Sequence, residues 1–294
     1  MDDAAASSTA LATALMRSLH TRLDPHPLIE DPWGERLVPD TLRSRFDDAR
    51  LLRSPAFPNV ITRTRYAEDA LRTAVSRGIR QYVLIGAGFD SFCLRRPDFA
   101  RKLEIFEIDH PATQTLKLSR IEECGIELPP TVHFVAADLS KLSLVQALAG
   151  SSFDSAQLAF FSWLGVTMYL TRDANLATMR SVAHLCPPGS ELAFTYMDAA
   201  RLQSPSPAFE EMQKQVSALG EPFLCGFDPG TIAAETARCG FELIEDLSGT
   251  EALARYGRSN DPALSRPSSS HVALARVADR KAPAGGLDST LPYD

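Results

Sequence analysis

Two glycines and an acidic residue have the spacing of a nucleotide-binding turn. An apolar run at residues 81–85 leads into Gly86 and Gly88, and the next apolar run, at residues 104–108, is followed by Asp109. A glycine has no Cβ, so a ligand can lie close to the backbone there. An acid at the end of the second strand, roughly 20 residues further on, can accept hydrogen bonds from both ribose hydroxyls. The pattern therefore predicts a strand, a glycine turn, a helix and a second strand that bind a nucleoside together.

The residues inside the turn favour a cofactor without phosphate groups. A dinucleotide site has a third glycine where this chain has Ser91, and Asp90 adds a carboxylate to the turn. That charge would repel a pyrophosphate, which argues against a nicotinamide oxidoreductase. The sulfonium and ammonium groups of S-adenosylmethionine fit such a turn better. A tight strand-to-helix turn with no ligand is the alternative explanation.

A further acid follows the third predicted strand. Asp138 and Leu139 come directly after the apolar run at residues 132–136. In an open α/β sheet the ligand lies outside the carboxyl ends of the strands, so Asp138 is well placed to accept the exocyclic amine of an adenine. The Leu139 backbone N–H could then donate to a ring nitrogen. An N-cap or an Asx turn is the structural alternative for Asp138.

The elements that must position these residues alternate between strands and helices after residue 78. This order is typical of an α/β fold with a doubly wound, Rossmann-like and mainly parallel sheet. The segment 247–270, before the last strand, has little helical periodicity, which predicts an antiparallel pair at one sheet edge. The seven predicted strands are residues 81–85, 104–108, 132–136, 157–161, 191–196, 241–246 and 271–277.

The first quarter of the chain has helical periodicity and no strand pattern. Apolar residues recur at helical spacing over about residues 9–23, and a longer helix is expected over about 60–76. We therefore divide the chain into an N-terminal helical lid (1–78), a cofactor-binding core (79–278) and a disordered tail (279–294).

Composition excludes several classes of protein. The net charge is −7 and no block of Lys and Arg is present, which argues against a nucleic-acid partner. No apolar run approaches the roughly 20 residues of a membrane span, and the acidic start Met1-Asp2-Asp3 is unlike a secretory signal. The five cysteines are scattered without CxxC spacing, so we expect reduced thiols, a cytoplasmic protein and no metal site.

The chain resembles the leucine carboxyl methyltransferases and their bacterial relatives that O-methylate polyketides and other secondary metabolites. The resemblance runs from about residue 10 to residue 277, and its motifs are specific as an ordered set. The matching pieces are residues 13–18, 27–37, 63–66, 86–90, 106–109, 137–139, 168–170 and 220–223. This family has the class I methyltransferase fold, with seven strands of which the last is antiparallel.

The resemblance also implies roles for individual residues. Arg63 would bind the methionyl carboxylate of S-adenosyl-L-methionine, and Gly86 would lie beneath that moiety. Asp109 would bind the ribose, and Asp138 with Leu139 would bind adenine. One position departs from the family, because Leu164 stands where an acid is common. Ser162 is the nearest polar residue that could replace it.

These observations predict an O-methyltransferase that acts on a carboxyl or hydroxyl group of a small molecule. A carboxylate acceptor is already ionised and needs no general base, whereas a hydroxyl does. No catalytic residue is evident from the sequence, and His20 and His26 are the histidines that could be tested as a base. The alternatives are a protein C-terminal carboxyl methyltransferase and a binding module with weakened catalysis.

Overall fold

A seven-stranded sheet forms the centre of the molecule. The computed structural model describes residues 7–266 and 268–279. The strand order is β3-β2-β1-β4-β5-β7-β6, and β7 runs antiparallel to both of its neighbours while the other pairs are parallel. The strands are β1 Gln81–Ile85, β2 Glu104–Asp109, β3 Val132–Ala136, β4 Ala159–Trp163, β5 Glu191–Met197, β6 Phe241–Ser248 and β7 Ser270–Val277. The expected fold class and the antiparallel pair are therefore confirmed.

The central strands β1, β4 and β5 are buried on both faces, which explains why β1 reads as a continuous apolar run. Along β1, Tyr82 and Leu84 pack into one hydrophobic cluster, whereas Val83 and Ile85 pack into another. Successive side chains of a strand point to opposite faces, so the two clusters lie on opposite sides of the sheet. Burial on both faces is what a parallel sheet with helical crossovers requires.

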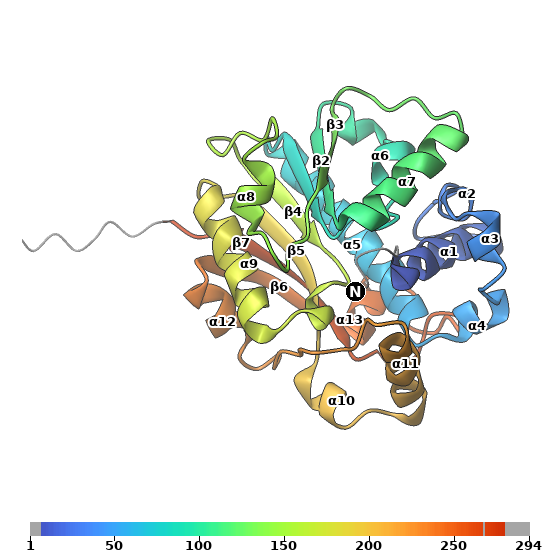
Figure 1. Ribbon diagram of the computed structural model, residues 1–294. Helices are drawn as coiled ribbons and strands as arrows, with labels where there is room; N and C mark the ends of the chain where they lie inside the picture. The colour runs from blue at the N-terminus through green and yellow to red at the C-terminus, as the bar shows by residue number, and fades with distance from the viewer. Residues whose placement is uncertain (1–6, 267, 280–294) are drawn as a thin grey trace, which may run out of the picture.

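Helices α8, α9 and α12 cover one face, and a larger group including α1, α5, α6, α7 and α13 covers the other (Figure 1). The first group is α8 Leu144–Leu148, α9 Arg172–Leu185 and α12 Ile232–Arg238. The second is α1 Ser8–Leu23, α2 Gly34–Leu37, α3 Asp40–Arg43, α4 Asp48–Arg53, α5 Ala56–Ser76, α6 Phe92–Arg95, α7 Pro111–Glu123 and α13 Gly249–Arg255. The helices α10 Ala199–Gln203 and α11 Pro207–Ala218 project from one end, and the 3₁₀ turns are η1 Asp98–Ala100 and η2 Thr167–Tyr169.

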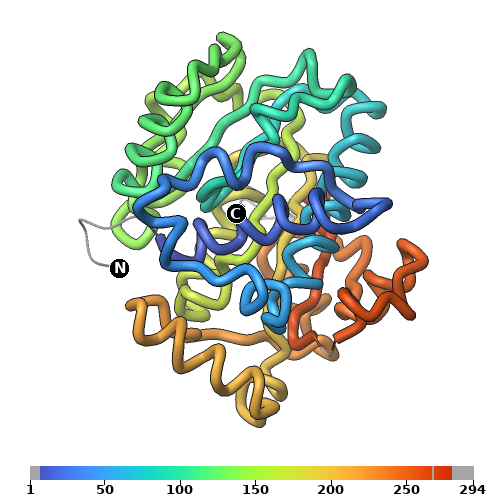
Figure 2. Tube along the Cα trace, turned by 90° about the vertical axis from the view of Figure 1, so that its right-hand side faces the viewer, coloured from blue at the N-terminus to red at the C-terminus, as the bar shows by residue number. Residues whose placement is uncertain are grey.

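The N-terminal helices share the hydrophobic core with the sheet. Leu15 of α1 and Ile61 of α5 belong to the same buried cluster as Tyr82 and Leu84. Figure 2 shows this segment, in blue, running across the front of the molecule. The expected boundary near residue 78 falls between α5 and β1. Movement of the segment as a lid stays a prediction, and nearly all of the expected tail, 280–294, lies outside the described residues.

Two local expectations were wrong. The fourth strand was expected at residues 157–161, but Gln157 closes a turn on Asp154 with an N···O distance of 3.1 Å, and β4 begins two residues later at Ala159. The segment 247–270 also contains α13. Its first turn has a capping box in which Ser248 and Glu251 satisfy each other's backbone N–H groups.

Candidate cofactor site

The glycine turn and the acid at the end of β2 are in direct contact. Gly86 N donates a 2.9 Å hydrogen bond to the carbonyl of Ile108. Asp109 then accepts hydrogen bonds from the backbone N–H groups of Gly88 and, at 2.6 Å, His110. Burial raises the pKa of Asp109, and the two backbone donors oppose that rise. The structure therefore brings together the three residues that the sequence placed beside a nucleoside.

The two glycines are required by backbone conformation as well as by space. Gly86 and Gly88 have φ angles of 69° and 51°, a region that disfavours other residues. A Cβ on Gly86 would lie 2.5 Å from Val166 Cγ2, and one on Gly88 would lie 3.0 Å from the Ala10 side chain. Val166 follows β4, and Ala10 belongs to the first turn of α1. The turn is thus covered from both sides by segments far apart in the sequence.

Arg63 on α5 packs beside the same glycine turn but forms no ion pair with an acidic residue that the structure describes. Its guanidinium donates a 3.1 Å hydrogen bond to Asn59 and packs on Gly165, where a Cβ would lie 2.7 Å from Arg63 Cζ. Within residues 7–266 and 268–279, Arg63 forms no ion pair. Burial lowers its pKa to about 10. Asp90 of the turn favours the charged form of Arg63 without forming an ion pair with it, and a partly buried cation without an ion-pair partner is costly.

Asp138 is engaged locally. Its Oδ1 atom accepts hydrogen bonds from the Ser140 N–H at 3.0 Å and the Ser140 hydroxyl at 2.6 Å, and Lys141 lies 2.9 Å from Oδ2. These contacts, led by the Ser140 hydroxyl, lower the pKa of Asp138 to about 2. The carboxylate thus forms the Asx turn that was the structural alternative, and it remains 20% exposed. Leu139 packs against the hydrophobic cluster that contains Val83 and Ile85.

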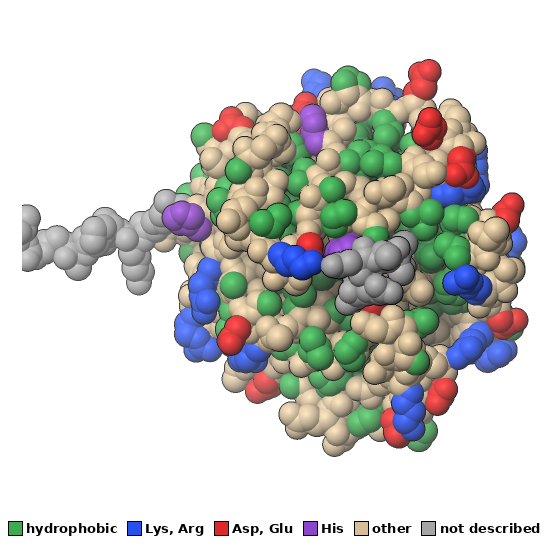
Figure 3. All heavy atoms as spheres, viewed as in Figure 1, with side chains coloured by type: hydrophobic (Ala, Val, Ile, Leu, Met, Phe, Trp, Pro, Cys, Tyr) green, Lys and Arg blue, Asp and Glu red, His purple; other side chains and the backbone are tan. Residues whose placement is uncertain are grey.

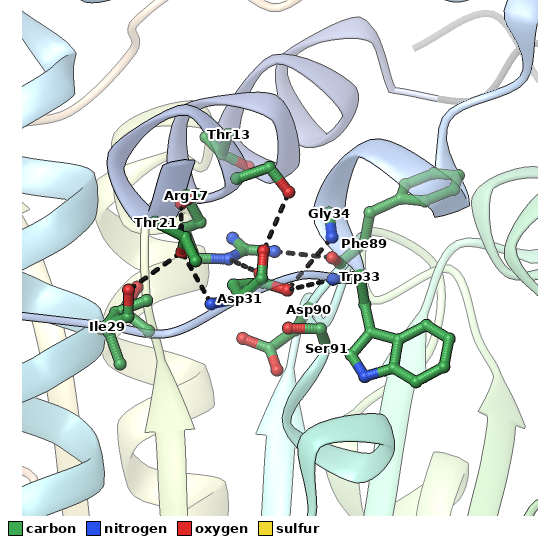
Figure 4. Close-up of polar contacts among 12 residues, drawn as sticks. Thr13, Arg17, Thr21, Ile29, Asp31, Trp33, Gly34, Phe89, Asp90 and Ser91 are labelled. Atoms are coloured by element: carbon green, nitrogen blue, oxygen red, sulfur yellow. Dashed lines mark hydrogen bonds and ion pairs between the residues drawn. The ribbon is translucent and has the colours of Figure 1, made fainter. Parts of the chain in front are cut away.

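A buried ion pair attaches α1 to the glycine turn. Arg17 Nε lies 2.7 Å from Asp31 Oδ2, and Arg17 Nη2 donates a 2.6 Å hydrogen bond to the carbonyl of Phe89 (Figure 4). Asp31 is fully buried and also accepts hydrogen bonds, each 3.1 Å, from the backbone N–H groups of Trp33 and Gly34. Burial acts to raise the pKa of Asp31, but Arg17 and other partners hold it below its ordinary value.

A second ion pair continues this network into α5 and α6. Ser91 helps to lower the pKa of Asp31 and accepts a 2.9 Å hydrogen bond from Arg95 Nε. Arg95 then forms a two-pronged ion pair with Glu68 of α5. Sequence reasoning used the segments of Arg17 and Asp31 for recognition but assigned them no role. Arg17 and Asp31 fix the glycine turn against the N-terminal helices, because Arg17 donates to the carbonyl of Phe89 in that turn.

Leu164, the residue that departs from the family, also has apolar surroundings. Leu164 packs against the cluster that contains the N-terminal helices. Ser162, the polar residue considered as a replacement, is buried, and its hydroxyl opposes the rise that burial gives to the pKa of Tyr82. Neither position offers an acid.

The two histidines considered as bases are placed differently. His20 is 3% exposed, and its Nε2 atom accepts a 2.9 Å hydrogen bond from the Leu28 N–H. Burial lowers the pKa of His20. A buried ring whose nitrogen already accepts from the backbone is not free to take a proton from a substrate. His26 lies on the exposed loop after α1.

The surface charge, the helix lengths and the cysteines indicate no further kind of site. On the face in Figure 3, acidic and basic side chains are interspersed. Across the described ranges, no helix is long and apolar enough to cross a membrane, and no group of three His, Cys, Asp or Glu could hold a metal ion. All five cysteines are free thiols.

Comparison with known proteins identifies the family. The sequence pattern of the leucine carboxyl methyltransferase family matches residues 10–183, more than half of the chain. The Bacillus subtilis (strain 168) protein YktD, provisionally named an S-adenosyl-L-methionine-dependent methyltransferase, is 30% identical, with 82% of this chain and 88% of YktD covered. ML2020 of Mycobacterium leprae, which carries the same provisional name, is 29% identical, with 85% and 84% covered.

Solved structures show the same fold. A DUF574 family protein from Streptomyces avermitilis superposes with a TM-score of 0.64 at 14% identity, covering 92% of this chain and 97% of that one. A protein from Thermobifida fusca, provisionally called a methyltransferase, has a TM-score of 0.62 at 16% identity, covering 94% and 97%. The cofactor expected from the sequence, S-adenosylmethionine, is the one the family uses. The chain belongs to the leucine carboxyl methyltransferase family of S-adenosylmethionine-dependent methyltransferases.

Proposed function

We propose that this protein transfers the methyl group of S-adenosylmethionine to an oxygen atom of a small molecule, a carboxylate or an acidic hydroxyl of a secondary metabolite. The observation that carries the cofactor half of this proposal is Arg63, a partly buried cation without an ionic partner beside the glycine turn. The cofactor's methionyl carboxylate supplies the missing anion, and a guanidinium can bind it through two parallel hydrogen bonds.

The other residues divide the cofactor between them. Gly86 and Gly88 leave room for the methionyl group, and Asp109 accepts the ribose hydroxyls while keeping its backbone donors, because each carboxylate oxygen can accept more than one hydrogen bond. Asp138 and the Leu139 N–H bind the adenine, which requires Asp138 to share its carboxylate with Ser140. The network of Arg17 and Asp31 holds this arrangement in position without touching the cofactor.

Positioning is the main catalytic contribution we assign to the chain. When bound, the cofactor supplies an electrophilic methyl group on a sulfonium. The protein excludes water and aligns the acceptor oxygen, since a near-attack geometry accounts for much of the barrier reduction in such displacements. The N-terminal segment, with Ala10 against Gly88, forms one wall of the acceptor site and acts as the lid.

An acceptor that is ionised in solution fits the histidine geometry. His20 is occupied by the Leu28 backbone, so we assign no general base to it. Carboxyl methylation is also the reaction in the name of the matched family. Free thiols at all five cysteines suit a cytoplasmic enzyme. Methylation of a protein C-terminus is the second candidate, and it is favoured by the family's description alone.

A methyl-transfer assay with a panel of acceptors tests the proposal. Radiolabelled S-adenosylmethionine is incubated with carboxylic acids, phenols, alcohols and amines of similar size, and with peptides ending in leucine. We expect transfer to acids or acidic phenols, a kcat/KM that does not follow a histidine near pH ~6.5, and turnover retained in His26→Ala. Transfer confined to amines or to peptides would reject the small-molecule O-methyl assignment.

A further inference from the structure

A buried carboxylate lies beside the candidate cofactor site without a cationic partner. Glu221, in the loop after α11, is 6% exposed. Its Oε2 atom accepts a hydrogen bond from the Thr9 hydroxyl at the start of α1. In the part of the chain that the structure describes, no Lys, Arg or His forms an ion pair with Glu221. An acid buried in this way without a counter-ion is expensive to retain.

The position of Glu221 is fixed by its neighbours. Thr9 immediately precedes Ala10, whose side chain covers Gly88 of the glycine turn. The Tyr169 ring lies 5.6 Å from the ring of Phe223, two residues after Glu221. Burial raises the pKa of Tyr169 to about 12, and the nearby Glu221 carboxylate adds to that rise.

Arg63 also lies near Tyr169. The positive charge of Arg63 acts on Tyr169 in the opposite sense to Glu221. Arg63 also packs on Gly165, next to Val166, which covers Gly86. A cation and an anion thus both lie near the Tyr169 phenol and the two glycines, and neither forms an ion pair with a residue that the structure describes. An amino-acid zwitterion has the matching charges, a carboxylate and an ammonium.

We infer that Glu221 binds the ammonium group of the cofactor's methionyl moiety, opposite the carboxylate bound by Arg63. The inference rests on the proposed cofactor site and adds a residue to it. The Thr9 hydroxyl orients the Glu221 carboxylate, and so couples α1 to the occupied site.

Binding calorimetry with three ligands tests this assignment without turnover. The ligands are S-adenosylhomocysteine, its analogue without the ammonium group, and 5′-methylthioadenosine, which lacks the amino-acid end. The variants are Glu221→Gln and Thr9→Val, with Glu211→Gln on the exposed side of α11 as the matched control. Glutamine keeps the shape and the hydrogen bond from Thr9 but removes the charge.

We expect Glu221→Gln to weaken S-adenosylhomocysteine binding roughly tenfold or more, as for loss of a charge-assisted hydrogen bond. Affinity for the analogue without the ammonium should be unchanged or higher, and 5′-methylthioadenosine should bind as in wild type, which shows that the variant is folded. Thr9→Val should have a smaller effect on S-adenosylhomocysteine, and Glu211→Gln none.

Two results would overturn the inference. Wild-type preference for the ammonium-bearing ligand in Glu221→Gln would show that the acid binds something else. An equal loss for all three ligands, reproduced by Thr9→Val, would show that Glu221 only fastens α1. Failure of the wild type to bind any of the ligands would instead reject the proposed cofactor site, so the two failures are distinguishable.

Discussion

Two arginines approach the glycine turn, and only one of them is neutralised. Arg17 is 5% exposed, forms a 2.7 Å ion pair with Asp31 and donates to the carbonyl of Phe89. Arg63 is partly buried, has a side-chain amide as its hydrogen-bond partner and has a pKa lowered to about 10 by desolvation. The charge of Arg17 is therefore neutralised within the protein, whereas the charge of Arg63 has no ion-pair partner among the described residues.

This difference separates a structural charge from a binding charge. Breaking a buried pair strands its partner, so removal of Arg17 should damage the fold. Arg63 strands no acid when it is removed, and its lowered pKa means that its charge costs stability at every pH below about 10. Replacing Arg63 should therefore damage binding and leave the fold intact.

The largest expected effect is on stability. Arg17→Met should lower the free energy of unfolding by about 3–5 kcal/mol, because Asp31 is left buried without its counter-ion. Arg63→Met should lower it little or raise it. Chemical denaturation of the two variants and wild type measures both values. A similar loss in the two variants would remove the distinction between the arginines.

Acid titration sharpens the same comparison. The folded pKa of Asp31 is below its ordinary value, so its ionised form stabilises the fold above pH ~4 and this stability is lost as the pH falls through the folded pKa. The deficit of Arg17→Met should then shrink in acid. Asp98→Asn serves as the control, since Asp98 is 90% exposed and its ion pair with Arg101 should contribute within about 1 kcal/mol. A deficit that is constant with pH would show that Arg17 acts by packing alone.

A smaller effect is expected at the ribose position. Asp109→Asn should weaken S-adenosylhomocysteine binding roughly tenfold, because neutral hydrogen bonds replace charge-assisted ones. The pKa of Asp109 is raised, so wild-type affinity should fall as the pH is lowered through a value above the ordinary one for an aspartate. Calorimetry over a pH series checks this, and the variant should lack the acidic limb. The assignment fails if both proteins show the same pH profile.

The smallest effect is expected at Asp138, which is already engaged with Ser140. Asp138→Ala should weaken the binding free energy of S-adenosylhomocysteine by about 0.5–1.5 kcal/mol. It should also reduce the preference for S-adenosylhomocysteine over the analogue in which hypoxanthine replaces adenine. Competition between the two ligands measures the preference. If the variant discriminates as well as wild type, Asp138 serves the Asx turn only.

The sheet could be predicted because its strands carry a strong local signal. All five residues of β1 are buried, and its apolar run ends at glycines whose positive φ angles terminate the strand. The same reasoning missed α13, although Ser248 and Glu251 have the spacing of a capping box. That signal was present in the sequence and was overlooked because the segment also contains two prolines.

The site was predictable in part for a different reason. Residues at strand ends, such as Asp109, are placed by the topology, so their meeting with Gly88 followed from the strand order. The partnership of Arg17 with Asp31, and the approach of Glu221 to α1, depend on contacts between segments far apart in the chain. One sequence does not reveal which of several arginines is paired, and this is the property that distinguishes Arg63.

The most direct test of the account is the binding of S-adenosylhomocysteine and 5′-methylthioadenosine to wild type and Arg63→Met by calorimetry. The account predicts that the variant loses roughly ten- to a hundredfold in affinity for S-adenosylhomocysteine. It also predicts that the variant binds 5′-methylthioadenosine, which has no carboxylate, as well as wild type does. Unchanged affinity of Arg63→Met for S-adenosylhomocysteine would contradict the claim that this unpaired arginine binds the cofactor.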